Sequence, residues 1–167
     1  MGEKIVRKIF GLVLIISNAM FCSTHAGEDT SEKSIVSVPV SPKTGEILTG
    51  EQLTDEQMPP EIVVQAQLEA YNKGDIDAFV NTYAKDVKIY NHPNSILYSG
   101  HDRIRKVYGE LFKTHPDLNV TIQRRIVQGN FVIDHELAVG LVENKTITVA
   151  AVYEVIRGKI QNVWFIQ

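Results

Sequence analysis

The spacing of hydrophobic residues changes once along this chain of 167 residues, at Leu118. Before Leu118, apolar residues recur at helical intervals; after it, they alternate with polar residues, as they do in β-strands. Two-residue turn signals, Gly129-Asn130 and Arg157-Gly158, divide the alternating part and predict β-hairpins. We therefore expect helices followed by an antiparallel meander, which is an α+β fold, with strands at 118–128, 131–142, 146–156 and 159–166.

Three helices are predicted before the meander. The first begins at Pro59-Pro60 and ends at Gly74, because proline is favoured in the first helical turn and glycine just after the last. Asp75 is a capping residue for a second helix, and the third covers residues 102–113. A strand at 86–92 and a loop that contains Pro93, Asn94 and Gly100 separate the last two helices. The predicted domain spans residues 59–167.

The first 26 residues have a different composition. Lys4, Arg7 and Lys8 precede an apolar stretch of 13 residues, 9–21, which is too short to span a bilayer comfortably but is typical of a secretory signal. We predict a signal peptide at 1–26, cleaved before Gly27, and a periplasmic or secreted protein; a buried N-terminal helix is the alternative. Residues 27–58 are rich in Ser, Thr, Gly, Pro and acids, and are predicted to be a flexible linker or arm.

Composition excludes several classes of protein. The chain has 17 Lys and Arg against 20 Asp and Glu, and no basic run exceeds two residues, which argues against a nucleic-acid partner. The single cysteine, Cys22, excludes a disulfide framework and a thiolate zinc site. The histidines form no helical i, i+4 pair, and no phosphate or dinucleotide loop is present. We therefore expect no metal, no cofactor and, after signal cleavage, no membrane contact.

Hairpin register predicts which side chains lie together. With Gly129-Asn130 as the turn, Arg124 lies opposite His135 on a face that is otherwise apolar. A three-residue turn at 143–145 then places Tyr153 beside His135, and the turn at 157–158 places Asn162 beside Tyr153. A two-residue middle turn is rejected because it would point the apolar residues of the third strand away from that face. The sequence thus predicts a polar row across the apolar face, Arg124–His135–Tyr153–Asn162.

This polar row has two interpretations. A buried polar group without a partner costs about 1–3 kcal/mol, so the four side chains either form a hydrogen-bond ladder or line a pocket with apolar walls. The other face of the first hairpin is polar, with Arg125 opposite Asp134.

Part of the sequence resembles a known family. Residues 68–79, LEAYNKGDIDAF, and 83–87, YAKDV, resemble the opening of nuclear transport factor 2-like proteins, and the likeness continues at Gly100, 103–105 and 153–160. It is greatest to the SnoaL-like and ketosteroid-isomerase-like branch and covers roughly residues 60–167. The resemblance implies a cone-shaped curved antiparallel sheet, wrapped by three N-terminal helices around an apolar cavity. It implies the fold more firmly than a reaction.

The catalytic residues of ketosteroid isomerases are absent at the matching positions. The family's first-helix Tyr, its Asp base and its late-strand Asp correspond to Gln67, Asn91 and either Ala151 or Val152. The Trp-Asp pair of many SnoaL-like cyclases is Trp164-Phe165 here. The resemblance therefore does not imply steroid isomerisation by the usual chemistry.

Other residues are candidates for a site. His135 and His92 are candidate catalytic bases, because histidine is the side chain whose ordinary pKa, about 6.5, suits proton abstraction near neutrality. The candidate ligand-binding residues are Arg124, Tyr153, Asn162, Asn91, Tyr83 and Trp164. An Arg and a His together favour a small hydrophobic ligand that carries a carbonyl or carboxylate group.

Three functions stay open: a cofactor-free isomerase, cyclase or lyase; a non-catalytic carrier; and a dimerisation module, which a cavity filled with side chains would indicate. We also expect a homodimer, formed through the sheet face that the helices leave open, with Thr121, Ala138, Ala150, Val152, Val163 and Phe165.

Overall fold

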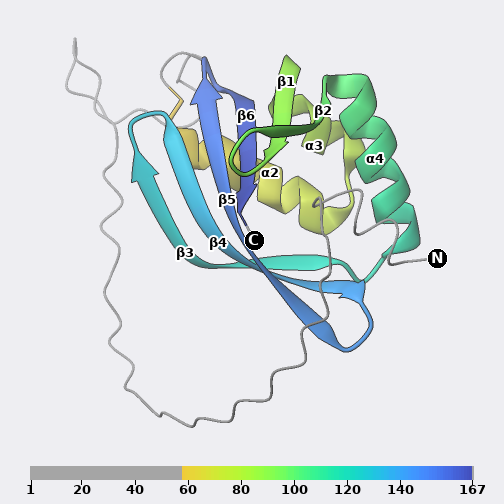
Figure 1. Ribbon diagram of the computed structural model, residues 1–167. Helices are drawn as coiled ribbons and strands as arrows, with labels where there is room; N and C mark the ends of the chain where they lie inside the picture. Colours follow the sequence, from red (N-terminus) through yellow and green to blue (C-terminus); the bar gives the residue numbers. More distant parts are fainter. Residues whose placement is uncertain (1–57, 167) are drawn as a thin grey trace, which may run out of the picture. The chain divides into compact units, whose positions relative to one another are not determined.

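The computed structural model describes residues 58–166, so the predicted signal peptide and nearly all of the predicted linker lie outside the described residues. Three helices lie on one side of a curved, unclosed sheet: α2 (Pro60–Lys73), α3 (Ile76–Asn81) and α4 (His101–Thr114) (Figure 1). The strands are β1 (Tyr83–Asn91), β2 (Ser95–Ser99), β3 (Asn119–Gln128), β4 (Phe131–Val142), β5 (Lys145–Ile156) and β6 (Lys159–Ile166), in the order β2-β1-β6-β5-β4-β3. The predicted α+β fold is confirmed.

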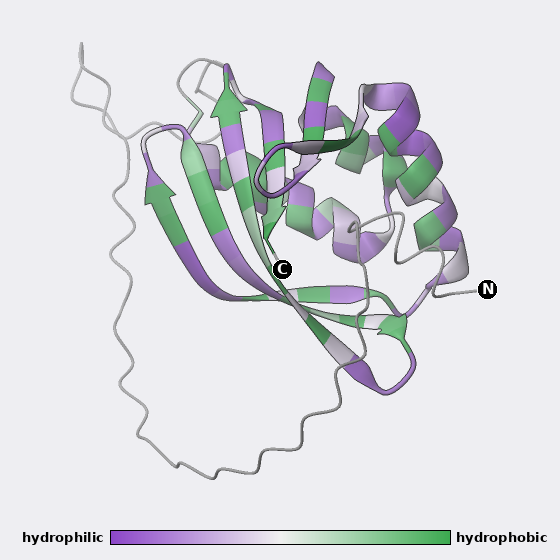
Figure 2. Ribbon diagram, viewed as in Figure 1, coloured by the Kyte–Doolittle hydropathy of each residue, from purple (hydrophilic) through white to green (hydrophobic). Residues whose placement is uncertain are grey.

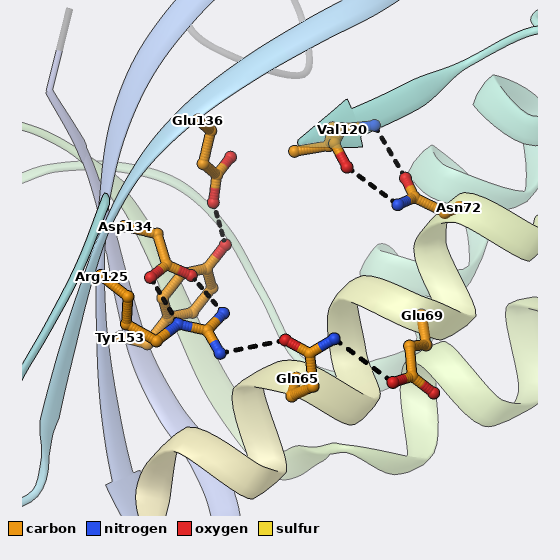
Figure 3. Close-up of polar contacts among 8 residues, drawn as sticks. All are labelled: Gln65, Glu69, Asn72, Val120, Arg125, Asp134, Glu136 and Tyr153. Atoms are coloured by element: carbon orange, nitrogen blue, oxygen red, sulfur yellow. Dashed lines mark hydrogen bonds and ion pairs between the residues drawn. The ribbon is translucent and has the colours of Figure 1, made fainter. Parts of the chain in front are cut away.

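The helix ends follow from the sequence signals. α2 begins at Pro60, and Gly74 ends it with a φ of 66°, a left-handed conformation that glycine adopts without steric cost. The side chain of Asp75 accepts hydrogen bonds from the backbone N–H groups of Asp77 and Ala78 at the start of α3. Near its C-terminal end α2 is fixed to β3, because the Asn72 side chain exchanges two hydrogen bonds, of 2.8 and 2.9 Å, with the backbone of Val120 (Figure 3).

The first strands differ in part from the prediction. The strand predicted at 86–92 is β1, which begins three residues earlier, and the predicted loop after it contains the short strand β2. β1 pairs in the antiparallel sense with β2 but in the parallel sense with β6. The meander from β3 to β6 is therefore joined to β1 by one parallel pair.

The register of the meander departs from simple alternation at three shifts. β3 and β4 pair as predicted from Arg124 to Gln128, but the register shifts between Ile122 and Arg124. It shifts again between Ala138 and Val142, and between Glu154 and Val155. After a bulge residue, the side chains that follow lie on the opposite side of the sheet. Strict alternation therefore predicts the wrong face for the residues beyond each shift.

The middle turn is one of these corrections. Val142 pairs directly with Lys145, so the turn has two residues, Glu143 and Asn144, and the predicted three-residue turn is wrong. The irregularity sits instead at Gly140, where φ is 82° and a Cβ atom would lie 2.3 Å from the backbone oxygen of Asp117. Only glycine fits this approach.

The predicted polar row is therefore wrong, because its four side chains do not lie together on one face of the sheet. Arg124 does lie opposite His135, but His135 lies opposite Ala150 rather than Tyr153. Asn162 lies opposite Glu154, and both point to the convex face together with Arg124 and His135. Tyr153 alone among the four faces the helices.

The core lies between the helices and the concave face of the sheet. The largest fully buried side chains are Phe79, Ile89, Ile104, Leu111, Ile160, Val64, Val87, Val132, Val149 and Val163. Helix α4 buries Ile104, Tyr108 and Leu111 in this core, whereas Ile62 of α2 is exposed. Hydrophobic and hydrophilic residues alternate along the strands (Figure 2), and the convex face keeps apolar side chains in contact with solvent. No helix within 58–166 is long and apolar enough to cross a membrane.

Candidate functional site

Two residues on the concave face form a buried acid–hydroxyl pair. Glu136 on β4 is 7% exposed, and the Tyr153 hydroxyl on β5 donates a hydrogen bond of 2.8 Å to its Oε1 atom (Figure 3). Burial raises the pKa of Glu136 to about 7, because the charged form loses its water; the hydrogen bond from Tyr153 acts in the opposite direction. Glu136 is therefore poised to exchange a proton near neutral pH.

A small cavity adjoins this pair. It has a volume of about 20 Å³, which is room for about one water molecule, and its lining consists of Gln67, Leu68, Tyr71, Tyr83, Tyr108, Val120, Glu136, Tyr153 and Phe165. The Tyr71 hydroxyl is buried and has no hydrogen-bond partner among residues 58–166. A buried polar atom without a partner is uncommon and needs an explanation.

The tyrosines around the cavity are donors at physiological pH. Burial raises the pKa of Tyr71, Tyr83 and Tyr153 well above the ordinary value of 10.0, and raises that of Tyr108 to about 12. Each hydroxyl therefore keeps its proton. Beyond the cavity wall, the Tyr98 hydroxyl donates to that of Tyr108 at 3.3 Å, which holds the Tyr108 ring end in place.

A second polar group lies two residues along β4 from Glu136. Arg125 donates two hydrogen bonds of 2.7 Å to the two oxygens of Asp134, whose side chain is only 1% exposed. Arg125 also donates to Gln65, and Gln65 donates to Glu69 on the same helix (Figure 3). This network joins β4, β3 and α2 and neutralises the Asp134 charge beside Glu136.

The arrangement supports general acid–base chemistry. A carboxyl group with a pKa of about 7 is populated in both protonation states at neutral pH, so it can donate or accept a proton. Tyrosine hydroxyls at the same cavity can donate hydrogen bonds to an oxygen that gains negative charge. Within 58–166, no group of three or more His, Cys, Asp or Glu side chains could hold a metal ion.

Two of the eight predicted site residues line this cavity, Tyr153 and Tyr83. Arg124 and His135 are exposed on the convex face. On the same face, Asn162 donates a 2.6 Å hydrogen bond to Glu154, and the Trp164 ring stacks on Tyr90 at 5.4 Å. The structure therefore brings neither His135 nor these three neighbours to the cavity.

The remaining two predicted residues lie at the end of β1. Asn91 is half-buried and pairs with Phe165 of β6 and Ser95 of β2. His92 is exposed, and its backbone N–H donates to the Phe165 oxygen at 2.9 Å. His92 is absent from the lining of the cavity.

Sequence reasoning missed Glu136 and Tyr71. Simple alternation from the turn at 129–130 places Glu136 on the polar face of the hairpin with Asp134, and the helical spacing of Tyr71 indicates packing. One signal was available: an isolated glycine within a strand pattern, Gly140, indicates a bulge that reverses the face.

Comparisons with known proteins agree with this fold. The family model of the SnoaL-like domain matches residues 64–163. The structure is similar to a cystatin-fold protein from Novosphingobium aromaticivorans, with a TM-score of 0.61 and 22% identity over 66% of this chain and 99% of that one. It is also similar to a SnoaL-like protein from Burkholderia thailandensis, with a TM-score of 0.54 and 14% identity over 64% of this chain and 91% of that one.

A third similar structure is a nuclear transport factor 2-like protein from Cytophaga hutchinsonii, with a TM-score of 0.54 and 16% identity over 65% of this chain and 89% of that one. None of the curated proteins matches the sequence. At these identities the structural likeness concerns the fold alone, whereas the family match covers more than half of the sequence. The chain belongs to the family of SnoaL-like domains.

Proposed function

We propose that this domain binds a small carbonyl compound at the concave face and that Glu136 moves a proton on it without a cofactor. One observation carries the proposal: a buried carboxyl group with a pKa of about 7 lies on the wall of a tyrosine-lined cavity. Perturbed carboxyl groups in enclosed sites are frequent among catalytic acids and bases. The Tyr71 hydroxyl, which has no partner within 58–166, is a donor available to the ligand.

The proposed reaction is an enolisation. The Glu136 carboxylate accepts a proton from a carbon next to the carbonyl group, the electron pair of that C–H bond forms a C=C bond, and the π electron pair of the carbonyl group moves onto its oxygen. Tyr71 donates a hydrogen bond to that oxygen as it gains charge. When protonated Glu136 first exchanges its proton with solvent, transfer back to the same carbon gives exchange; transfer to another carbon of the conjugated system gives isomerisation. Either transfer restores the carboxylate.

Binding requires side chains to move. A cavity of about 20 Å³ does not hold an organic molecule, so the ligand must displace part of the wall. Leu68 on α2 is a half-buried aliphatic residue in that wall, and we propose that its side chain is the one displaced.

The proposal is tested by hydrogen–deuterium exchange at the substrate. A set of small cyclic ketones is incubated with the full chain in D₂O, and loss of the α-proton signal is followed by NMR. We expect faster exchange of at least one ketone, abolished by Glu136→Gln and kept by His135→Gln, the neighbouring substitution on the convex face. Equal exchange by the wild type and Glu136→Gln contradicts the proposal.

A second function, dimerisation, is supported by the convex face. Ile126, Phe131 and Ile166 expose 59%, 38% and 39% of their surface there, as an interface would require. The residues expected for this interface need correction, because Ala138, Val163 and Phe165 lie buried on the concave face. Light scattering at micromolar concentration should give twice the monomer mass, and a clean monomer contradicts the dimer.

Export is proposed from the sequence of residues 1–26. N-terminal sequencing of the mature protein from its own host should begin at Gly27. Intact Met1 on the bulk of the protein contradicts export by cleavage.

A further inference from the structure

A second hollow lies where the C-terminal end of α2 meets the side of α4; it shares Tyr71 with the cavity but includes neither Glu136 nor Tyr153. It has a volume of about 760 Å³, within the usual range for small-molecule sites. We call it the helical groove and define it by Lys73, Ile76, Lys106, Gly109, Phe112 and Lys113.

The rim of the helical groove is positively charged. Lys73, Lys106 and Lys113 form no ion pair with any residue of 58–166, whereas Arg105 is paired with Asp77. Glu110 is the one acidic residue in the lining that the structure describes. Residues 58–166 contain 12 Lys and Arg and 12 Asp and Glu, so this excess of lysine is local.

Helix electrostatics account for part of the charge. Lys73 and Lys113 lie in the last turns of α2 and α4, where a cation is favoured by the helix dipole. Lys106 lies in the middle of α4, where the dipole gives no such reason. Three unpaired ammonium groups around one hollow make an anion the favoured occupant.

The floor of the groove is apolar. Ile76 and Phe112 are half-buried, and Gly109 between the two lysines of α4 has no side chain to fill the hollow. The ring of Phe112 is held by edge contacts with Tyr71 and Phe79, so this floor is part of the rigid core. A ligand for this groove therefore needs an apolar body as well as a charge.

We propose that the helical groove binds an amphipathic carboxylate. Its carboxylate lies between Lys106 and Lys113, and its apolar chain lies on Ile76 and Phe112. The inference goes beyond the function proposed for the cavity and does not depend on Glu136.

The test is an NMR titration of the ¹⁵N-labelled full chain with decanoate, decyltrimethylammonium and acetate. Decanoate should shift the amide signals of Gly74 and Gly109. Acetate lacks the apolar chain and decyltrimethylammonium has the wrong charge, so neither should do so. Lys106→Glu with Lys113→Glu should weaken decanoate binding about tenfold, because each lost contact at an exposed site is worth roughly 0.2–1 kcal/mol and each reversed charge adds repulsion.

The matched control reverses two exposed lysines away from the groove, Lys85→Glu with Lys145→Glu, and should bind decanoate as the wild type does. Equal weakening in both double variants, or equal binding of the cation, overturns the proposal. Shifts confined to Glu136 and Tyr153 place the ligand in the cavity and also overturn it. Glu136→Gln should leave decanoate binding unchanged, which separates this test from that of the proposed function.

Discussion

Each face of the sheet carries a few residues that depart from the usual relation between polarity and burial. On the concave face, which the helices cover, lie Arg125, Asp134 and Glu136. On the convex face, in contact with solvent, lie Ile126 and Phe131 together with the stacked pair of Trp164 and Tyr90. Buried polar groups rarely increase stability and exposed apolar groups favour association, so each face indicates a role beyond folding.

Adjacent residues make the comparison testable. Arg124 and Arg125, His135 and Glu136, and Trp164 and Phe165 are neighbours in sequence on opposite faces. Substituting both members of a pair compares the faces at nearly the same place in the chain.

The largest effect is expected at the arginine pair. Arg125→Ala leaves Asp134 buried without its partner, which should lower the free energy of unfolding by about 3–5 kcal/mol. Arg124→Ala, at an exposed position, should change it by less than about 0.5 kcal/mol. Urea denaturation measures both. Similar decreases in the free energy of unfolding for the two variants would contradict the difference in burial between Arg124 and Arg125.

The aromatic pair should separate packing from association. Phe165→Ala removes a side chain that is 5% exposed and should cost about 3 kcal/mol in urea denaturation. Trp164→Ala should cost about 1 kcal/mol, mostly from the lost stacking on Tyr90, and should reduce the mass seen by light scattering if the convex face is the interface. An unchanged mass for this variant argues against that interface.

Glu136 should make stability depend on pH. Its pKa is raised in the folded state, so the folded protein holds the proton more tightly than the unfolded chain between about pH 4.5 and 7. The free energy of unfolding should therefore fall as pH rises through this window, by roughly 2–3 kcal/mol from this group. Glu136→Gln should remove that fall, while His135→Gln should keep it; denaturation curves at pH 5 and pH 8 give the comparison.

The smallest effect is expected at Tyr71. Tyr71→Phe removes a hydroxyl that has no partner within 58–166, so stability should stay the same or rise by up to about 1 kcal/mol. Tyr153→Phe is the control, because it removes the hydrogen bond to Glu136 and should lower stability by about 1–3 kcal/mol. Thermal melts of both variants suffice. A large loss for Tyr71→Phe would mean that its hydroxyl has a partner.

Sequence patterns predicted the elements better than the site. Helix ends follow from Pro60, Gly74 and Asp75, because capping depends on residues close together in the chain. The pairing of Arg124 with His135 was also predictable, since it depends on one adjacent turn.

The site was not predictable from alternation, because three register shifts reverse the face between adjacent turns. A residue inserted near Gln123 moves Arg125 to the concave side without a change in composition that would reveal it. The charge of Asp134 and Glu136 also favours the solvent face, because aspartate and glutamate seldom lie in a core. The ion pair of Arg125 with Asp134 and the hydrogen bond from Tyr153 to Glu136 are contacts across strands that alternation places on the wrong side.

The proton affinity of Glu136 tests the account most directly. The ¹³C chemical shift of its side-chain carboxyl, followed against pH in the full chain and assigned by comparison with Glu136→Gln, gives the pKa without any ligand. A midpoint near 7 is expected for a carboxyl group buried beside Tyr153 and held by a single hydrogen bond from it. A midpoint near the ordinary value of 4.5 would show that water reaches Glu136 and would contradict the proposed acid–base site.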